Sequence, residues 1–239
     1  MMTADSYHLS NVAIKRVTEQ FFSMQLVKLL PEGQNNLSPV GVEVDAQVEM
    51  SVNSWFIDGP EGRVLIDTAM GDGKDRSFSP LFNQRNSPWM DNLKRTVIGP
   101  DDIDYVLHPH LHTDLVGRNT VWNGKQWVPA FIHATWVCPQ VVLDFVMSQQ
   151  SIAREVVFGD SIAPIIECGP VVTLPNTATI FFLGITFYPT PGHSIGHMSI
   201  VLESEAETSI FCGDIMHTPL QVEHNTLSSV FGRDCVLAN

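Results

Sequence analysis

Hydrophobic positions in the first half of the chain form two strand-like runs and then take a helical period. The strand-like runs, Met50–Ile57 and Arg63–Asp67, flank turn residues at 58–62 and predict a β-hairpin. Residues Pro88–Val97 carry apolar side chains at helical spacing, and Ser87 stands where it can cap them. We therefore predict a hairpin followed by a helix.

Short strands dominate the second half of the pattern. Apolar residues stacked one turn apart after Pro139 predict a second helix, which continues or restarts over Ser151–Phe158. Asn123 and Gly124 predict a tight hairpin over 121–128, because this pair tolerates positive φ angles. The remaining apolar runs are predicted to be strands: Ile162–Ile166, Val171–Leu174, Ile180–Tyr188, Met198–Leu202 and Ser209–Cys212.

This order of elements is typical of an α/β sandwich with mixed sheets. No internal repeat, low-complexity tract or linker divides the sequence, so we expect one domain over residues 1–239. Residues 1–45 show no clear period, and we predict no element for this poorly defined N-terminal segment.

Composition narrows the class of partner. The chain has 13 basic and 26 acidic residues, which argues against nucleic acid or an anionic membrane as a partner. We see no apolar run of about 18 residues and no signal peptide, so we expect a cytoplasmic protein.

The cysteines are scattered and form no pair at metal-binding spacing. We therefore expect reduced thiols in the core rather than disulfides or a structural zinc site. Cys212, close to Asp214, is an alternative zinc thiolate, although a buried thiol is the preferred interpretation. The four cysteines are Cys138, Cys168, Cys212 and Cys235.

Candidate chemistry is concentrated directly after the apolar run 103–107. His108, His110, His112 and Asp114 occupy alternating positions, and an extended backbone turns alternate side chains to one side. Imidazole and carboxylate groups that converge on one point are first of all a metal-site signature.

Two later strand ends can complete such a site. His193 lies in a glycine-rich turn after the strand that ends near Tyr188, and Asp214 follows the apolar residues 210–211. Loops at the carboxyl ends of separate strands can converge on one edge of a sheet.

In this order and at these intervals, the three motifs resemble the metallo-β-lactamase-fold hydrolases over about residues 50–235. The residues after Gly117 and Asp214 are similar to the branch that holds N-acyl-homoserine lactonases and methyl-parathion-hydrolase-like enzymes. The resemblance implies a four-layered αβ/βα sandwich with a metal site at one edge. It also implies that His110, His112 and His193 hold a first metal ion, with Asp214 bridging to a second.

The resemblance further makes Asp114 a second-site ligand and a candidate catalytic base. Two departures affect that second site. The family has a histidine where this chain has Leu115, and residues 215–239 contain no match to the family's last histidine. We therefore expect one zinc ion, with a weak second site better suited to manganese. We also expect a C-terminally shortened fold, and hence either a partner subunit such as a second copy (a homodimer) or reduced stability.

Several residues keep two interpretations at this stage. His108 and His217 are either replacement ligands or hydrogen-bonded loop histidines. Trp122, Trp127 and Phe131 either wall a substrate pocket or belong to the core.

The resemblance implies a hydrolase that uses a metal-activated water on a lactone or ester, and hence a small-molecule substrate. Leu115 keeps open a degenerate member that binds metal with weak or no catalysis. A thiolester hydrolase of the glyoxalase type would share the same ligands.

Overall fold

Two β-sheets packed face to face form the centre of the protein. The computed structural model describes residues 6–31, 43, 45–96, 99–148, 155–182, 184–234 and 237. The larger sheet has the strand order β1-β2-β3-β4-β5-β8-β9 and the smaller one the order β10-β11-β12-β13. In the larger sheet the strands are β1 Ser6–Leu9, β2 Val12–Gln25, β3 Gln47–Gly59, β4 Gly62–Ile66, β5 Tyr105–Leu107, β8 Thr135–Pro139 and β9 Val171–Leu174. In the smaller sheet they are β10 Thr179–Phe182, β11 Ile185–Pro189, β12 Met198–Ser204 and β13 Glu207–Phe211.

Strand direction brings the functional loops together. Strands β4, β5, β8 and β9 run parallel to one another, so their carboxyl ends lie at one edge of the larger sheet. In the smaller sheet β11 and β13 are each antiparallel to β12, so these two strands also share a direction. The loop after β5 is joined to the smaller sheet by a hydrogen bond from the Met198 backbone N–H to the Pro109 carbonyl at 3.2 Å.

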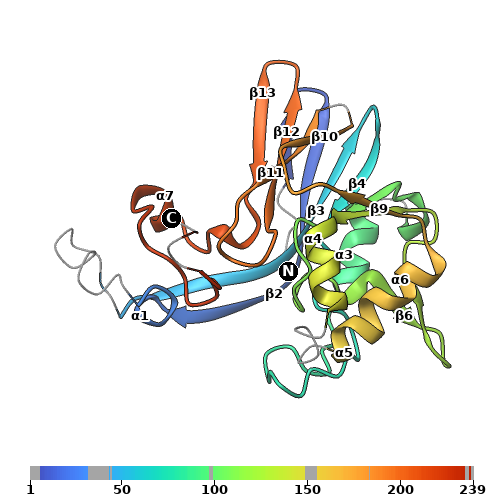
Figure 1. The fold of residues 1–239 in the computed structure, drawn as a ribbon, viewed down its shortest axis with the longest axis horizontal. Coiled ribbons are helices and arrows are strands. Elements are labelled where there is room, and N and C mark those ends of the chain that lie inside the picture. The colour runs from blue at the N-terminus through green and yellow to red at the C-terminus, as the bar shows by residue number, and fades with distance from the viewer. Residues whose placement is uncertain are drawn as a thin grey trace.

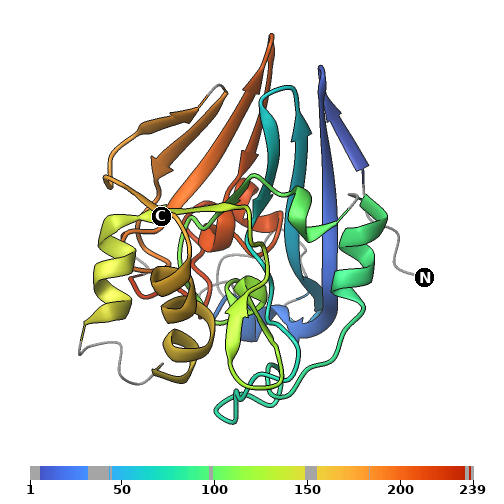
Figure 2. The same ribbon diagram turned by 90° about the vertical axis from the view of Figure 1, so that its right-hand side faces the viewer.

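Helices cover the outer face of the larger sheet (Figure 1). Trp89 and Leu93 of α3 pack there against Phe56 and Val106 of the sheet, and Ile165 of α6 joins the same cluster. Figure 2 gives the view onto these helices. The helices of this layer are α3 Trp89–Thr96, α4 Gln140–Met147, α5 Glu155–Val157 and α6 Ala163–Cys168. Helices α1 (Leu26–Leu29) and α7 (Leu220–Glu223) lie away from this layer and share a separate apolar cluster with Met24 of β2 and Met50 of β3.

A second apolar cluster lies between the two sheets. Ile66 and Leu107 of the larger sheet pack there with Phe187 and Ile200 of the smaller sheet, all four nearly inaccessible to solvent. The layers agree with the predicted αβ/βα sandwich. None of the described helices is long and apolar enough to cross a membrane.

Most elements predicted from the sequence are present. Strands β3 and β4 form the predicted hairpin, with only Pro60 and Glu61 between them. Helix α3 is confirmed, and its first residue donates a backbone hydrogen bond to the Ser87 hydroxyl at 3.4 Å; Val97 lies outside the described residues. Helix α4 is confirmed, and α5 falls within the predicted 151–158 region, whose first four residues are likewise outside those described.

The hairpin predicted over 121–128 is present, but the tight turn predicted for it is wrong. Strands β6 (Thr120–Trp122) and β7 (Trp127–Pro129) pair around four connecting residues. Gly124 takes the positive φ of +96° that the asparagine–glycine pair predicted.

The strand predicted at Ile162–Ile166 is wrong. These residues lie in a π-helical turn, Phe158–Ile162, and in α6. Ile165 packs under the larger sheet while Ile166 is exposed, so burial follows a helical face. A short apolar run cannot be distinguished from a buried helical segment by periodicity alone.

The N-terminal segment, for which no element was predicted, contains β1, the long strand β2 and α1. The register of β2 shifts between Thr18 and Gln20, which interrupts the alternation of inward and outward side chains. Glu19 is buried at this irregularity. Because a charged residue takes an inward position there, the alternation of apolar and polar residues expected of a strand is not visible in the sequence.

Candidate metal centre

Three loops at the sheet edge supply four metal-ligand side chains. His110 and His112 lie on the loop after β5, His193 lies on the loop after β11, and Asp214 lies in the short turn after β13. One potential ligand atom from each side chain lies within 4.8 Å of the others. The structure thus brings together the four side chains that the sequence placed in a first metal site.

The spacing of these atoms suits a small tetrahedral ion. The Nε2 atom of His193 is 2.8 Å from Nδ1 of His112 and 3.5 Å from Oδ2 of Asp214. The same Asp214 oxygen is 3.4 Å from Nε2 of His110. A zinc ion with ligands at about 2.0–2.1 Å would place neighbouring donor atoms roughly 3.3 Å apart. Three imidazoles and a carboxylate at these separations fit one such ion.

His110 is the strongest single indication of a ligand. Its side chain is completely buried, and neither ring nitrogen makes a hydrogen bond with any residue that the structure describes, although Nε2 lies at ion-pair distance from the Asp214 carboxylate. A buried polar atom without a hydrogen bond costs about 1–3 kcal/mol. A metal ion at the cluster would reduce that cost by taking the lone pair of one nitrogen.

The charges of His110 and Asp214 stabilise each other. Burial disfavours the charged form of each group, yet the Asp214 carboxylate raises the pKa of His110 above its ordinary value. In return His110, followed by His193, lowers the pKa of Asp214 despite its burial. Asp214 is therefore an anion at neutral pH, the form that binds a cation.

Asp114 lies outside the four-residue cluster but lines the same pocket as Asp214 and Asp67. The volume of this pocket is about 320 Å³. We call this the Asp114 pocket. Burial, together with the negative charge of Asp214, raises the pKa of Asp114 to about 7. Leu115, which also lines the pocket, is 7% exposed and offers no donor atom on its side chain. Its carbonyl accepts hydrogen bonds from the backbone and hydroxyl of Thr68, which fixes the loop beside the cluster.

His108 has the placement of a hydrogen-bonded loop histidine. Its Nδ1 is 3.1 Å from Oδ1 of Asp67, and its Nε2 is 2.9 Å from Oδ1 of Asn119. Both ring nitrogens are engaged, and the ring stacks near Trp136. The structure does not bring it into the cluster.

His217 is closer to the cluster but is not one of its four members. Its ring lies 5.7 Å from that of His193 and 5.2 Å from that of Phe231. Its Nδ1 has no hydrogen-bond partner among the described residues. Both interpretations of His217 therefore stay open.

His197 positions Asp214. Its Nδ1 lies 3.0 Å from the Thr190 carbonyl, and its Nε2 accepts the Asp214 backbone N–H at 3.2 Å. Burial, with the nearby His110 and His193, lowers the pKa of His197 to about 3, so the ring stays neutral. Gly213 makes this contact possible, because it has φ +58° and an added Cβ would lie 2.7 Å from the His197 Nε2.

Asp67 is a site residue for which no role was predicted from the sequence. It adopts a φ of +60°, unusual for a residue with a side chain, and turns its carboxylate towards His108 and the Asp114 pocket. Burial raises the pKa of this carboxyl. Its position at the end of an apolar strand was the only available signal.

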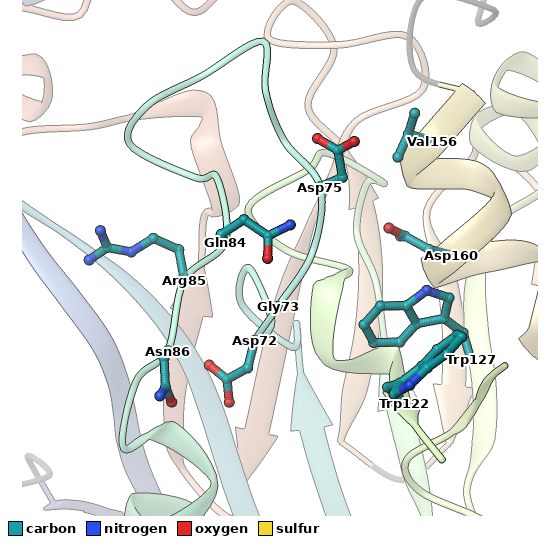
Figure 3. A pocket seen from close by; sticks show the side chains of 10 residues that line it. All are labelled: Asp72, Gly73, Asp75, Gln84, Arg85, Asn86, Trp122, Trp127, Val156 and Asp160. Carbon is teal, nitrogen blue, oxygen red and sulfur yellow. The ribbon is translucent and has the colours of Figure 1, made fainter. Parts of the chain in front are cut away.

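The predicted aromatic pocket divides into two environments. Trp122 and Trp127 line a pocket of about 770 Å³ with Asp72 and Gln84, and Figure 3 shows the two indoles on one side of it. None of the four clustered side chains lines this pocket. Of the two interpretations of Phe131, the structure supports the core and not the pocket wall. Phe131 is 1% exposed and packs against Trp136 under the larger sheet, because β7 leads directly into that layer.

The three cysteines that the structure describes are free thiols in different environments. Cys138 is buried, as predicted, and Cys212 is half-buried. Cys168 is exposed at the end of α6, so its predicted core position is wrong. Cys212 does not belong to the metal-ligand cluster, and burial raises its pKa, which disfavours the thiolate. Cys235 is outside the described residues.

Related sequences agree with this arrangement. Residues 48–227 match the Metallo-beta-lactamase superfamily. An N-acyl homoserine lactonase of Bacillus thuringiensis is 25% identical over 174 residues, which cover 68% of this chain. The match spans only 62% of that relative's length.

Solved structures share the fold. The chain superposes with a TM-score of 0.79 on a "probable metal-dependent hydrolase" from Staphylococcus aureus, at 17% identity and with 97% of this chain and 83% of the other covered. It also superposes with a TM-score of 0.75 on AidC, a dizinc quorum-quenching lactonase, at 16% sequence identity. That superposition covers 98% of this chain and 82% of AidC. The family match extends over most of the chain, and the histidine–aspartate cluster lies at the expected sheet edge. The chain therefore belongs to the metallo-beta-lactamase superfamily.

Proposed function

We propose that this protein is a metal-dependent hydrolase that opens lactones or cleaves simple esters. The observation that carries the proposal is the cluster of His110, His112, His193 and Asp214 at one sheet edge. The lactonase named among its relatives supports the substrate class. Zinc is the proposed ion, because three imidazoles and one carboxylate suit zinc better than a harder cation.

The protein side chains would have separate tasks. His110, His112 and His193 would hold the ion, and Asp214 would complete its coordination. The chemistry that such an ion supplies is activation of a water molecule and polarisation of a carbonyl. Hydrolysis forms a bond between the water oxygen and the carbonyl carbon and breaks the bond to the leaving alkoxide.

Asp114 is the proposed proton carrier. Its carboxyl lines the pocket beside Asp214, and its burial raises its pKa above the ordinary value, which favours taking a proton from water and returning it to the leaving alkoxide. His197 is a positioning residue, because it contacts the Asp214 backbone rather than any reacting atom.

A second candidate function follows from Leu115. Its apolar side chain lies where the second-site imidazole is expected from the family resemblance, so a second ion would have only carboxylates such as Asp114 and Asp214. A member that binds one ion and turns over slowly is therefore the alternative. A homodimer and a cytoplasmic location both stay predictions.

The test is hydrolysis by protein loaded with zinc or manganese. N-acyl-homoserine lactones of several chain lengths and aryl esters should be opened faster than by a His110→Ala variant at the same metal loading. Equal rates for the two proteins over the whole panel would refute the proposal. Activity many orders of magnitude below that of a dizinc lactonase, with one ion bound, would favour the alternative.

A further inference from the structure

An apolar pocket of about 350 Å³ lies beside the metal centre, and none of the roles proposed so far uses it. His112 and His193 form part of its wall, so a molecule in this pocket would reach the cluster directly. The rest of the wall comes from α4, the loop after β11 and residues near 231–233. We call it the Phe145 pocket; its apolar lining is Leu111, Val142, Phe145, Val146, Ile195 and Phe231.

Arg233 is the only cation among the residues that line the Phe145 pocket. Its backbone N–H donates to the His193 carbonyl at 3.0 Å, which fixes this segment against the metal-site loop. Its guanidinium carbon lies 5.5 Å from the centre of the Phe145 ring. The guanidinium forms no ion pair with any residue that the structure describes. In a chain with twice as many acidic as basic residues, this leaves a positive charge available to an anion.

The Asp114 pocket has the opposite character. Glu49, Asp67, Asp114 and Asp214 line it, and it has no lining residue in common with the Phe145 pocket. An anionic group would be repelled there by carboxylates and attracted by Arg233. A substrate with an anionic end should therefore bind with that end in the Phe145 pocket rather than in the Asp114 pocket.

We propose that the Phe145 pocket binds the apolar chain of the substrate and that Arg233 favours chains ending in a carboxylate or another anionic group. The inference rests on the proposed function, because that function places the scissile carbonyl at the metal centre. Each methylene buried in the pocket should raise kcat/KM about fourfold. Since Arg233 is exposed at the pocket rim, its effect should be smaller, about three- to fivefold.

The experiment compares two esters of equal chain length with the zinc-loaded protein. One is para-nitrophenyl hexanoate, and the other is the para-nitrophenyl monoester of adipic acid, whose chain ends in a carboxylate. The adipate ester should have the higher kcat/KM, by about three- to fivefold. Arg233→Gln should remove this preference and Arg233→Glu should reverse it. Arg63→Gln is the matched control, because Arg63 pairs with Asp58 and Asp102 and lines neither pocket.

A filling variant tests the apolar part of the pocket. Val146→Trp places a large ring in the cavity and should abolish the rise of kcat/KM from acetate to hexanoate esters. Its thermal melting curve would establish that the variant is folded. An unchanged dependence on chain length in a folded Val146→Trp protein would overturn the placement of the chain.

A binding measurement separates this inference from the proposed hydrolysis. Titration calorimetry with zinc-loaded protein should show adipate binding at least about threefold more tightly than hexanoate, a difference that Arg233→Gln removes. If no ester is cleaved but this difference is found, the proposed function fails and the pocket assignment stands. If both esters are cleaved equally well with or without Arg233, the pocket assignment fails and the proposed function stands.

Discussion

Nε2 of His193 lies 2.8 Å from Nδ1 of His112, although 81 positions separate the two residues in the chain. One histidine follows a strand of the larger sheet and the other a strand of the smaller sheet. Their ring nitrogens converge with the side chains of His110 and Asp214 at the junction of the sheets. The first prediction concerns the ion that these atoms would hold.

Removing one clustered ligand should remove the tight metal site. We expect one zinc ion per chain in the wild-type protein by elemental analysis after gel filtration, and much less than one in His110→Ala or His193→Ala. Asp214→Asn should also weaken binding, because the amide has no negative charge. His133→Ala is the control, since His133 is exposed and outside the cluster. Equal zinc content in His110→Ala and wild type would contradict the assigned site.

Zinc affinity should fall as the pH decreases. A metal ion binds neutral imidazole, and the pKa of His110 is raised above its ordinary value by Asp214. Below that raised pKa the ion must displace a proton, whereas above it no proton competes. Each displaced proton lowers the apparent affinity about tenfold per pH unit. Competition titrations with a chromogenic chelator at pH 8 and pH 6 would measure this; equal affinities at the two values would exclude proton competition at His110.

Leu115→His should strengthen the second metal site. The new imidazole would lie next to Asp114 at the edge of the Asp114 pocket, so the zinc content should rise from one towards two ions per chain. Leu115→Asn is a control for polarity without an imidazole. Losing the buried leucine should cost about 1–3 kcal/mol of unfolding free energy in both variants. If the histidine variant binds no more zinc than the asparagine variant, the absent imidazole does not limit the second site.

Arg118→Met should destabilise the fold strongly. The guanidinium contacts Glu19 at 2.7 Å and Asp72 at 2.7 Å, and Glu19 is 3% exposed. Removing the cation leaves a buried carboxylate without its partner, at a cost of about 3–5 kcal/mol. Arg63→Met is the control, because its ion pairs with Asp58 and Asp102 are partly exposed and each contributes less than about 1 kcal/mol. Urea unfolding of both variants would give the comparison, and similar losses would contradict this reasoning.

Gly117→Ala should fold poorly or not at all. A Cβ at this position would lie 1.7 Å from the carbonyl oxygen of Met70, so the loop after β4 would have to move away from the metal-site loop. Gly159→Ala is a matched control, because a Cβ there meets no atom within 4 Å. Soluble yield and thermal melting would compare the two; a Gly117→Ala protein as stable as the control would show that these loops can separate easily.

Local pattern identified His110, His112, His193 and Asp214 as candidate ligands, and the family resemblance assigned them to the metal centre. Each follows an apolar strand, and strand ends that face the same way meet at one edge. The parts that could not be predicted depend on distant partners. Glu19 can be buried because Arg118, 99 positions away in the chain, forms a hydrogen bond with it. The local sequence pattern around Glu19 does not predict that pair.

Backbone conformation and tertiary packing account for other differences between the prediction from the sequence and the structure. The role of Asp67 depends on a positive φ that residues with side chains rarely adopt, and the sequence around it indicates only a turn. Phe131 and the tryptophans of β6 and β7 were treated alike because they are close in sequence. The hairpin places the indoles at one pocket and sends Phe131 into the core, a division set by tertiary packing.

The division of the cluster between two sheets has a mechanical consequence. His110 and His112 are attached to the larger sheet, whereas His193 and Asp214 are attached to the smaller one. An ion held by all four would act as a cross-link between the layers, and separating the layers would require releasing it. At a free zinc concentration one hundred times the dissociation constant, that linkage adds about 2.7 kcal/mol to the free energy of unfolding. The melting temperature of this protein should therefore rise with the fraction of chains that have zinc bound.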